Sequence, residues 1–168
     1  FENLPSCRSL PTTQPLCIAK LKIMTMNVRG LYKSQHDLIH LVATQNPDIL
    51  VFTEIKLKRT NKDRGWMERL LKNYKYWSAF DLSGGTTICV RNSLALTTQC
   101  SATSLSSDGR IASVILKGLN TSLLIIGTYW PSGSSAGSQI CRDQMQLQIQ
   151  LLIAKFPESI PIIAGDMN

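Results

Sequence analysis

The stretch D-I-L-V-F-T-E at residues 48–54 decides the fold. It follows Pro47 directly, is built of large apolar residues through its middle and closes on a carboxylate. A short apolar run of this kind predicts a strand that is buried on both faces, in a sheet covered by other elements. Since an unpaired carboxylate is costly to bury, we expect Glu54 at the carboxyl end of this strand, facing a crevice, a cation or a bound ligand.

Upstream of this strand, the sequence predicts another strand and a helix. Residues 20–27 alternate between apolar and polar side chains, which is typical of a strand, and this strand would end at Asn27. Ser34 and Asp37 have the spacing of a capping box for a helix that runs to about residue 45. A strand, a helix and a strand in this order predict a parallel βαβ unit, with Asn27 and Glu54 at the same edge of the sheet.

Downstream, the pattern changes to a short helix followed by antiparallel hairpins. Thr60 and Asp63 form a second capping-box pattern, ahead of a helix with apolar residues at positions 66, 67, 70 and 71. The serine-rich residues 101–108 are expected to form an exposed loop. Glycine-containing turns at 83–85 and 118–120 predict two hairpins, formed by residues 76–81 with 86–91 and by residues 110–117 with 122–129.

Two further elements are predicted after the second hairpin. Residues 132–138 are rich in Gly and Ser and predict a flexible loop, and residues 139–155 predict an amphipathic helix. Residues 160–164 predict another buried apolar strand, which closes on Gly-Asp-Met-Asn at 165–168. The Pro-rich and Ser-rich residues 1–19 predict an extended arm, so that residues 20–168 would form one incomplete domain.

The charge of the chain points to a polyanionic partner. The formal net charge is +7, and residues 56–75 alone hold eight Lys or Arg against Asp63 and Glu68. Such a patch raises the local concentration of a polyanion, and nucleic acid is the commonest one to consider. A solvated helix face is the alternative interpretation of the same residues.

The cysteines and the hydropathy pattern indicate the cellular compartment in which the protein is expected. The chain has five cysteines without a C-x-x-C pair, which indicates neither a zinc framework nor a secreted disulfide scaffold. No apolar run approaches the ~18 residues that a membrane span requires, so no membrane partner is expected. We therefore expect an intracellular protein, in the nucleus or another compartment that contains nucleic acid.

Polar residues follow four of the predicted strands. They are Asn27, Glu54, Tyr129 and the pair Asp166 and Asn168. If the strands share a sandwich, these side chains gather in one crevice. One carboxylate together with water and phosphate oxygens is a common way to hold Mg²⁺. A buried Asp could accept a proton from water. Amide or hydroxyl groups could donate hydrogen bonds to an oxyanion. The alternative for any single residue is that it caps its strand.

Several short segments, taken in order, resemble the endonuclease/exonuclease/phosphatase superfamily, also called DNase-like or AP-endonuclease-like. Their sequence pattern is most similar to that of the endonuclease domains of LINE-type non-LTR retrotransposons. The resembling segments span residues 20–168 and are M-N-V-R-G-L at 26–31, D-I-L-V-F-T-E at 48–54 with K-L at 56–57, G-G at 84–85, D-G-R at 108–110, Y-W-P at 129–131 and G-D-M-N at 165–168. The resemblance implies a four-layer αββα sandwich, truncated at its C-terminal part, and Mg²⁺-dependent hydrolysis of phosphodiester bonds, with Mn²⁺ as a possible substitute.

The resemblance also implies roles for individual residues. Glu54 would bind the metal, Asn27 would support the metal and the phosphate, and Tyr129 would contact the phosphate. Asp166 would activate the nucleophilic water and Asn168 would stabilise the transition state. The basic residues expected to contact DNA are Arg29, Lys56, Lys58, Arg59, Lys62, Arg64 and Arg110.

Two hypotheses from different classes follow. The family's domain continues beyond the G-D-x-N strand to a Ser-Asp-His segment, so the first hypothesis is an endonuclease that nicks DNA and needs this further part, on the same parent polypeptide or on a partner chain that completes the sheet. The second is a catalytically inactive remnant that serves as a structural or nucleic-acid-binding subunit of a larger assembly. A phosphatase or lipid phosphodiesterase of the same superfamily is a weaker alternative, because a small substrate does not need so long a basic tract.

Overall fold

The computed structural model describes residues 21–57, 60–118 and 120–167, without the side chains of residues 61–64, 66, 96 and 97. The described part contains eight strands and four helices. In chain order they are β1 (Ile23–Asn27), α1 (Gln35–Gln45), β2 (Ile49–Thr53), α2 (Asn61–Leu70), β3 (Tyr74–Ala79), β4 (Thr86–Arg91), α3 (Asn92–Thr97), β5 (Gln99–Leu105), β6 (Ile111–Lys117), β7 (Ser122–Tyr129), α4 (Ala136–Lys155) and β8 (Ser159–Asp166). None of these helices is long and apolar enough to cross a membrane.

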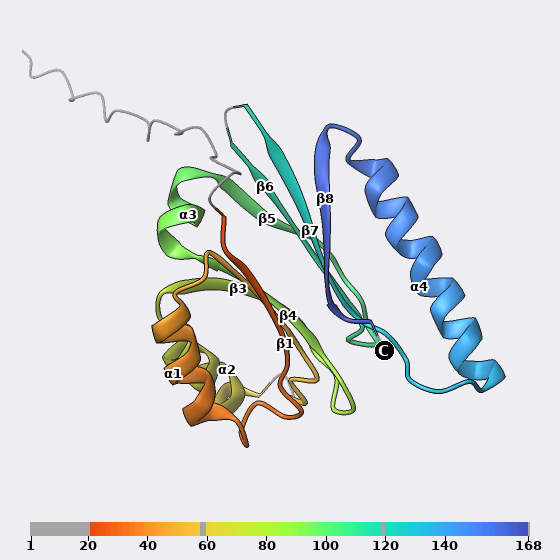
Figure 1. Cartoon of the computed structure of the whole chain (residues 1–168), viewed down its shortest axis with the longest axis horizontal. Coiled ribbons are helices and arrows are strands. Elements are labelled where there is room, and N and C mark those ends of the chain that lie inside the picture. Colours follow the sequence, from red (N-terminus) through yellow and green to blue (C-terminus); the bar gives the residue numbers. More distant parts are fainter. Residues whose placement is uncertain (1–20, 58–59, 119, 168) are drawn as a thin grey trace, which may run out of the picture.

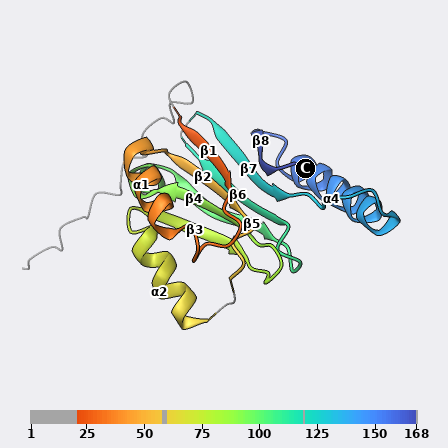
Figure 2. The same ribbon diagram turned by 60° about the horizontal axis from the view of Figure 1, so that its bottom comes forward.

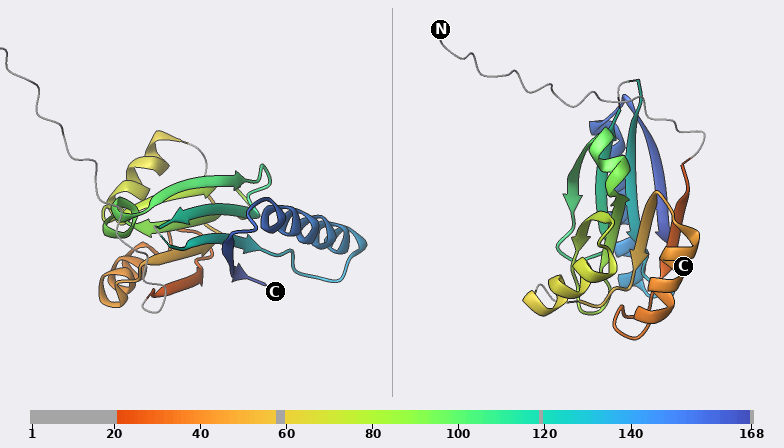
Figure 3. Two further views of the ribbon diagram at one scale, coloured as in Figure 1. Left: turned by 90° about the horizontal axis from the view of Figure 1, so that it is seen from above. Right: turned by 90° about the vertical axis from the view of Figure 1, so that its left-hand side faces the viewer.

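The strands form two four-stranded sheets that pack face to face. The first sheet has the order β1-β2-β4-β3 and the second has the order β5-β6-β7-β8. Figures 1 and 2 show α1 and α2 on the outer side of the first sheet and α4 on the outer side of the second, and Figure 3 shows the same layers from above and from the side. The fold is therefore the four-layer αββα sandwich that the resemblance implies.

The strand β2 is an inner strand of the first sheet and is buried on both faces, as its sequence predicts. All five of its side chains are buried. Leu50 and Phe52 pack in the core beneath the helices, whereas Ile49 and Val51 pack in the core between the two sheets. Because successive side chains of a strand point to opposite faces, this one apolar run supplies two cores at once.

Each sheet contains one parallel pair of strands joined through a helix, and the carboxyl ends of the two pairs lie close together. β1 pairs in parallel with β2, so that Asn27 lies opposite Thr53. β7 pairs in parallel with β8, so that Tyr129 lies opposite Asp166. Parallel strands bring their carboxyl ends to one edge, and β1 also contacts β8 across the sandwich. Both hairpins predicted from the glycine turns are confirmed as antiparallel pairs, β3 with β4 and β6 with β7.

The predicted exposed loop at residues 101–108 is wrong. Most of this segment belongs to β5, which pairs antiparallel with β6 from Gln99 opposite Lys117 to Leu105 opposite Ala112. The strand shifts register between Ala102 and Ser104, and it lies at the edge of the sheet with Gln99, Ser101 and Ala102 exposed. Edge strands carry polar residues and bulges, so composition alone did not separate this strand from a loop.

The expectation that residues 160–164 form a fully buried strand is also wrong in part. The strand exists as β8, but Ile160 is 50% exposed and Ile163 is 41% exposed. β8 is at the edge of the second sheet and pairs only with β7 among the described strands. An edge strand has a neighbouring strand on one side only, so part of the apolar surface of β8 remains exposed.

One capping bond and one helix start differ from the predictions. The side chain of Ser34 makes no capping bond to α1 and instead donates from its Oγ to the carbonyl of Val28 at 3.0 Å. α4 begins at Ala136, three residues earlier than the amphipathic pattern indicates, because the Oγ of Ser135 accepts a hydrogen bond from the backbone N–H of Ser138 at 3.1 Å.

Candidate active site

Glu54 lies directly after β2, in a turn held by backbone hydrogen bonds to two other segments. The residue has a φ of 53°, and Lys56 two positions later has a φ of 51°, both in the left-handed region. The carbonyl of Glu54 accepts a bond from the N–H of Gly30 at 2.7 Å, and the N–H of Lys56 donates to the carbonyl of Gly84 at 2.8 Å. Non-glycine residues keep such a backbone only where the surroundings enforce it, and this occurs most often at functional sites. Beyond the end of the buried strand, the Glu54 carboxylate contacts Asn27 and Lys56.

Asn27 connects two carboxylates that come from different sheets. Its Nδ2 donates to Glu54 Oε1 at 2.8 Å and to Asp166 Oδ2 at 2.5 Å. Its Oδ1 accepts from the backbone N–H of Arg29 at 3.1 Å, which fixes the orientation of the amide. One amide group thus holds Glu54 and Asp166 together, although they are far apart in sequence.

Gly165 sets the position of Asp166. It has a φ of 145°, and a Cβ there would lie 1.9 Å from the carbonyl oxygen of Thr128 on the neighbouring strand. Only glycine fits so close an approach of two backbones. The carbonyl of Asp166 in turn accepts from the N–H of Trp130 at 2.9 Å, which ties the end of β8 to the end of β7.

Tyr129 completes the cluster from the end of β7. Its hydroxyl is close enough to the Glu54 carboxylate for the two groups to change each other's pKa. Its ring lies against Gly84, where an added Cβ would be 3.0 Å from two ring carbons. The guanidinium carbon of Arg110 lies 5.3 Å from the ring centroid, and Arg110 Nη1 donates to the carbonyl of Tyr129 at 3.2 Å. The ring is therefore held between a glycine and a cation.

The charges of the cluster follow from these contacts. The hydrogen bond from Asn27 lowers the pKa of Glu54, and it outweighs burial, which acts in the opposite direction; Lys56 lowers the pKa further. Lys56 Nζ lies 2.9 Å from Glu54 Oε2. Burial raises the pKa of the Tyr129 hydroxyl, and the charge of Glu54 raises it further. At neutral pH the cluster thus presents an ionised carboxylate beside a protonated phenol that can donate a hydrogen bond.

A depression of about 400 Å³ opens beside Asn27 and Asp166 and is bordered by Arg29 and Met167. Larger depressions exist elsewhere on the molecule, at residues 115–122 with 155–159 and between α1 and α2. We assign the candidate active site to the depression beside Asn27 and Asp166, because both residues line it and the amide of Asn27 joins Asp166 to Glu54.

The oxygen atoms of this cluster suit a hard divalent cation. Among the described residues, no group of three or more His, Cys, Asp or Glu could hold a metal ion. Mg²⁺ does not require such a group, because it is often held by one or two carboxylates while keeping several waters. Glu54, with Asp166 beside it, fits that requirement, although Lys56 is an ion-pair partner with which a cation would compete.

The structure thus brings together Asn27, Glu54, Tyr129 and Asp166, four of the five residues expected at the reacting centre. Asn168, Lys58 and Arg59 lie outside the described residues, as do the side chains of Lys62 and Arg64 on α2. Of the remaining basic residues, Arg29 is exposed beside the depression, and Lys56 and Arg110 contact Glu54 and Tyr129. Sequence reasoning missed the pairing of Lys56 with Glu54 and the contact of Gly84 with Tyr129. The spacing of the acid and the lysine, two residues apart after a strand, was the available signal for the first.

Comparison with known proteins gives a family match and a set of similar folds. The profile described as the Endonuclease/Exonuclease/phosphatase family matches residues 24–168. A search of curated protein sequences finds no match. Among solved structures, the AP endonuclease LMAP from Leishmania major has a TM-score of 0.70 at 17% identity, over 88% of this chain and 55% of that chain.

Two further solved structures share the fold. The 3'-5' exonuclease NExo from Neisseria meningitidis has a TM-score of 0.65 at 17% identity, over 88% of this chain and 58% of that chain. The D. rerio TDP2 complexed with single strand DNA product has a TM-score of 0.59 at 18% identity, over 87% of this chain and 60% of that chain. This chain therefore spans a little more than half the length of these solved proteins.

Proposed function

The chain belongs to the Endonuclease/Exonuclease/phosphatase family, and from this premise we propose that it contributes the site for Mg²⁺-dependent hydrolysis of phosphodiester bonds in DNA. The observation that carries the proposal is the amide of Asn27, which joins the carboxylates of Glu54 and Asp166 from two different sheets. The solved neighbours support DNA as the substrate, since they include an AP endonuclease, an exonuclease and a TDP2 with a single strand DNA product.

The residues divide the chemistry between them. Glu54, ionised because Asn27 and Lys56 lower its pKa, would hold the metal. Mg²⁺ at this position, or Mn²⁺ in its place, would supply positive charge to the phosphoryl group and its leaving oxygen. Asp166 would accept the proton of the attacking water, and Asn27 keeps its carboxylate in place. The Tyr129 hydroxyl would donate to a phosphate oxygen, with Asn168 as a second donor.

Basic residues around the crevice would bind the DNA backbone. Arg29 is exposed at the depression, and Arg110 reaches the site through the ring of Tyr129. Lys56 would leave Glu54 for a phosphate once a metal replaces it. We further propose that Lys58, Arg59, Lys62 and Arg64 extend this surface along the strand of DNA.

The biological setting proposed here is a retrotransposon-like one. A nick in host DNA would prime reverse transcription, in the nucleus or another compartment that contains nucleic acid. Because the chain spans little more than half the length of its solved neighbours, we propose that full activity requires the part that completes the domain in those proteins.

The edge of the second sheet favours a second candidate function. β8 has one paired neighbour among the described strands and leaves Ile160 and Ile163 exposed. Open apolar edges are usually covered. A further segment or a second chain on this edge would complete an active nuclease or, in the alternative, would recruit this domain as a structural or nucleic-acid-binding subunit.

A nicking assay separates the two candidates. Supercoiled plasmid is incubated with Mg²⁺ and the chain, beside the isosteric variants Glu54→Gln and Asp166→Asn, with Glu68→Gln on the exposed face of α2 as the matched control. We expect only weak nicking from the unmodified chain and the control, because full activity would require the further part, and loss of that nicking in both site variants. Equal nicking in all four samples would overturn the assignment of the site, whereas DNA binding without nicking by the unmodified chain would favour the binding subunit.

A further inference from the structure

A groove crosses the outer face of the second sheet, at the end opposite the candidate active site. It consists of two depressions of about 480 and 330 Å³ that share four lining residues, Ile115, Lys117, Lys155 and Phe156. The larger depression reaches Ser122 and Ser159, the first residues of β7 and β8, whose last residues are Tyr129 and Asp166. At ~3.3 Å per residue, the groove is roughly 20–25 Å from the site.

The groove exists because α4 covers only part of the sheet. The helix packs on Ile111, Leu124 and Ile126, and it ends at Lys155. The alternate residues Ala112, Val114 and Leu116 of β6 lie between the sheets, so Ile115 and Lys117 point to the outer face, beyond the end of the helix. The outer side of β5 beside them is polar and carries Gln99, Ser101 and Thr103.

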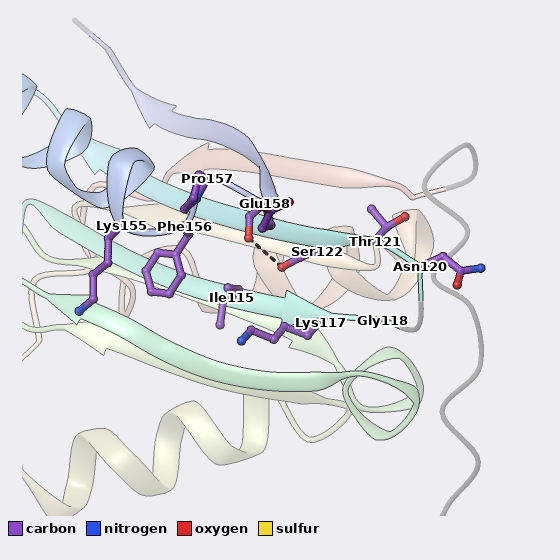
Figure 4. Close-up of a pocket in the computed structure, with 11 residues that line it drawn as sticks. Ile115, Lys117, Gly118, Asn120, Thr121, Ser122, Lys155, Phe156, Pro157 and Glu158 are labelled. Carbon is purple, nitrogen blue, oxygen red and sulfur yellow. Dashed lines mark hydrogen bonds between the residues drawn. The ribbon is translucent and has the colours of Figure 1, made fainter.

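The lining combines an aromatic ring, cations and neutral hydrogen-bonding groups. Figure 4 shows Phe156 beside Ile115, with Lys155 on one side of the pair and Lys117 on the other. Lys155 Nζ lies 5.7 Å from the centroid of the Phe156 ring. Neither β5 nor β6 contains an acidic residue, and Glu158 is the one carboxylate among the described residues that line the groove.

This combination has a specific chemical meaning. Two separated ammonium groups suit an anion with repeated charges, and an aromatic side chain between them suits a planar ring. Hydroxyl and amide groups add hydrogen bonds without demanding a particular sequence. A duplex offers phosphates, but it keeps its base faces stacked inside. A single strand offers phosphates and free base faces together.

We propose that this groove binds single-stranded nucleic acid, with a base against Phe156 and neighbouring phosphates at Lys117 and Lys155. The site is separate from the candidate active site and requires neither a metal nor hydrolysis. A strand held there would be a second contact of the protein with nucleic acid, on the face away from Glu54.

Binding of a labelled oligothymidine of about 12 nucleotides, followed by fluorescence anisotropy without Mg²⁺, tests the proposal. The variant Phe156→Leu keeps an apolar side chain against α4 and removes the aromatic ring. We expect it to weaken binding of the single strand at least fivefold and to leave binding of a duplex of the same length within twofold. Thermal unfolding of the variant reports whether it is folded.

The paired variant Lys117→Gln/Lys155→Gln tests the cations independently, since both side chains are exposed. Loss of two phosphate contacts should reduce the slope of log affinity against log salt by about 1.4. Lys22→Gln/Lys33→Gln, which removes two exposed lysines that lie outside the basic residues 56–75, is the matched control and should leave the slope unchanged. The proposal is overturned if both groove variants bind the single strand as the unmodified chain does, or if single-strand and duplex binding fall equally.

Discussion

Replacing Gly84 by alanine would test how the site positions its phenol. The Cβ of alanine would lie 3.0 Å from both Cδ1 and Cε1 of Tyr129, whereas ordinary contacts of a Cβ begin at about 3.4 Å. The Tyr129 ring must therefore move by about 0.4 Å. The backbone of Gly84 does not itself oppose the change, because its φ is not in the left-handed region. The effect of the substitution is thus transmitted through the ring.

This displacement should change both the free energy of unfolding and the pKa of Tyr129. Overpacking of a well-packed contact costs about 1–3 kcal/mol, and the half-buried ring of Tyr129 can give way, so we expect a loss of about 1 kcal/mol in the free energy of unfolding. Movement away from Glu54 weakens the electrostatic interaction between the hydroxyl and the carboxylate. The pKa of Tyr129, which burial and the charge of Glu54 raise, should then fall toward its ordinary value.

The assays are urea denaturation and a pH titration of the ¹³C-labelled tyrosine rings by NMR. Gly137→Ala is the matched control, because a Cβ at this helical position meets nothing within 4 Å. That substitution should stabilise the chain by less than the ~1 kcal/mol of a helix interior, because Gly137 lies in the first turn of α4. If the plasmid assay detects nicking, Gly84→Ala should lower it roughly tenfold, since a misplacement of 1 Å can cost about a hundredfold.

One outcome would refute the reasoning directly. If Gly84→Ala is as stable as Gly137→Ala and the pKa of Tyr129 does not change, the glycine does not hold the ring. A double-mutant cycle with Tyr129→Phe adds a second check. The effect of Gly84→Ala on nicking should disappear in the phenylalanine background, because the hydroxyl that it displaces is already absent.

Two further predictions concern the carboxylates and the strand that carries one of them. In Asn27→Ala, the pKa of Glu54 should rise toward 4.5, because the hydrogen bond from Asn27 is the largest cause of its lowering. A lowered folded-state pKa stabilises the native state above the unfolded pKa, and that stability is lost as the pH falls, so the free energy of unfolding should decline less steeply below pH 4.5 in the variant. An unchanged acid limb in denaturation curves would contradict this prediction. In Gly165→Ala, the clash at 1.9 Å with the Thr128 carbonyl should detach the end of β8 and cost about 3 kcal/mol or more, and hydrogen exchange at Trp130, whose N–H bonds Asp166, should become fast; slow exchange there would show that the strand tolerates a side chain.

Much of the architecture could be predicted from local sequence patterns. The apolar run of β2 indicated burial on both faces, and glycine turns identified both hairpins, because period and turn chemistry are encoded within a few residues. The edges were predicted less well. β5 was mistaken for a loop and β8 for a buried strand, since whether a strand lies at an edge depends on its neighbours in the sheet and not on its own residues.

The sequence by itself determined which residue types end four of the strands, and so it predicted a crevice with Asn27, Glu54, Tyr129 and Asp166 around it. Only the tertiary structure decided that the amide of Asn27 spans 139 residues to reach Asp166 while also holding Glu54. It also decided that Lys56 pairs with Glu54 and that Tyr129 rests on Gly84. The physical reason is that a strand fixes the direction of its side chains locally, whereas the distance between two strand ends is set by how two sheets twist and pack against each other.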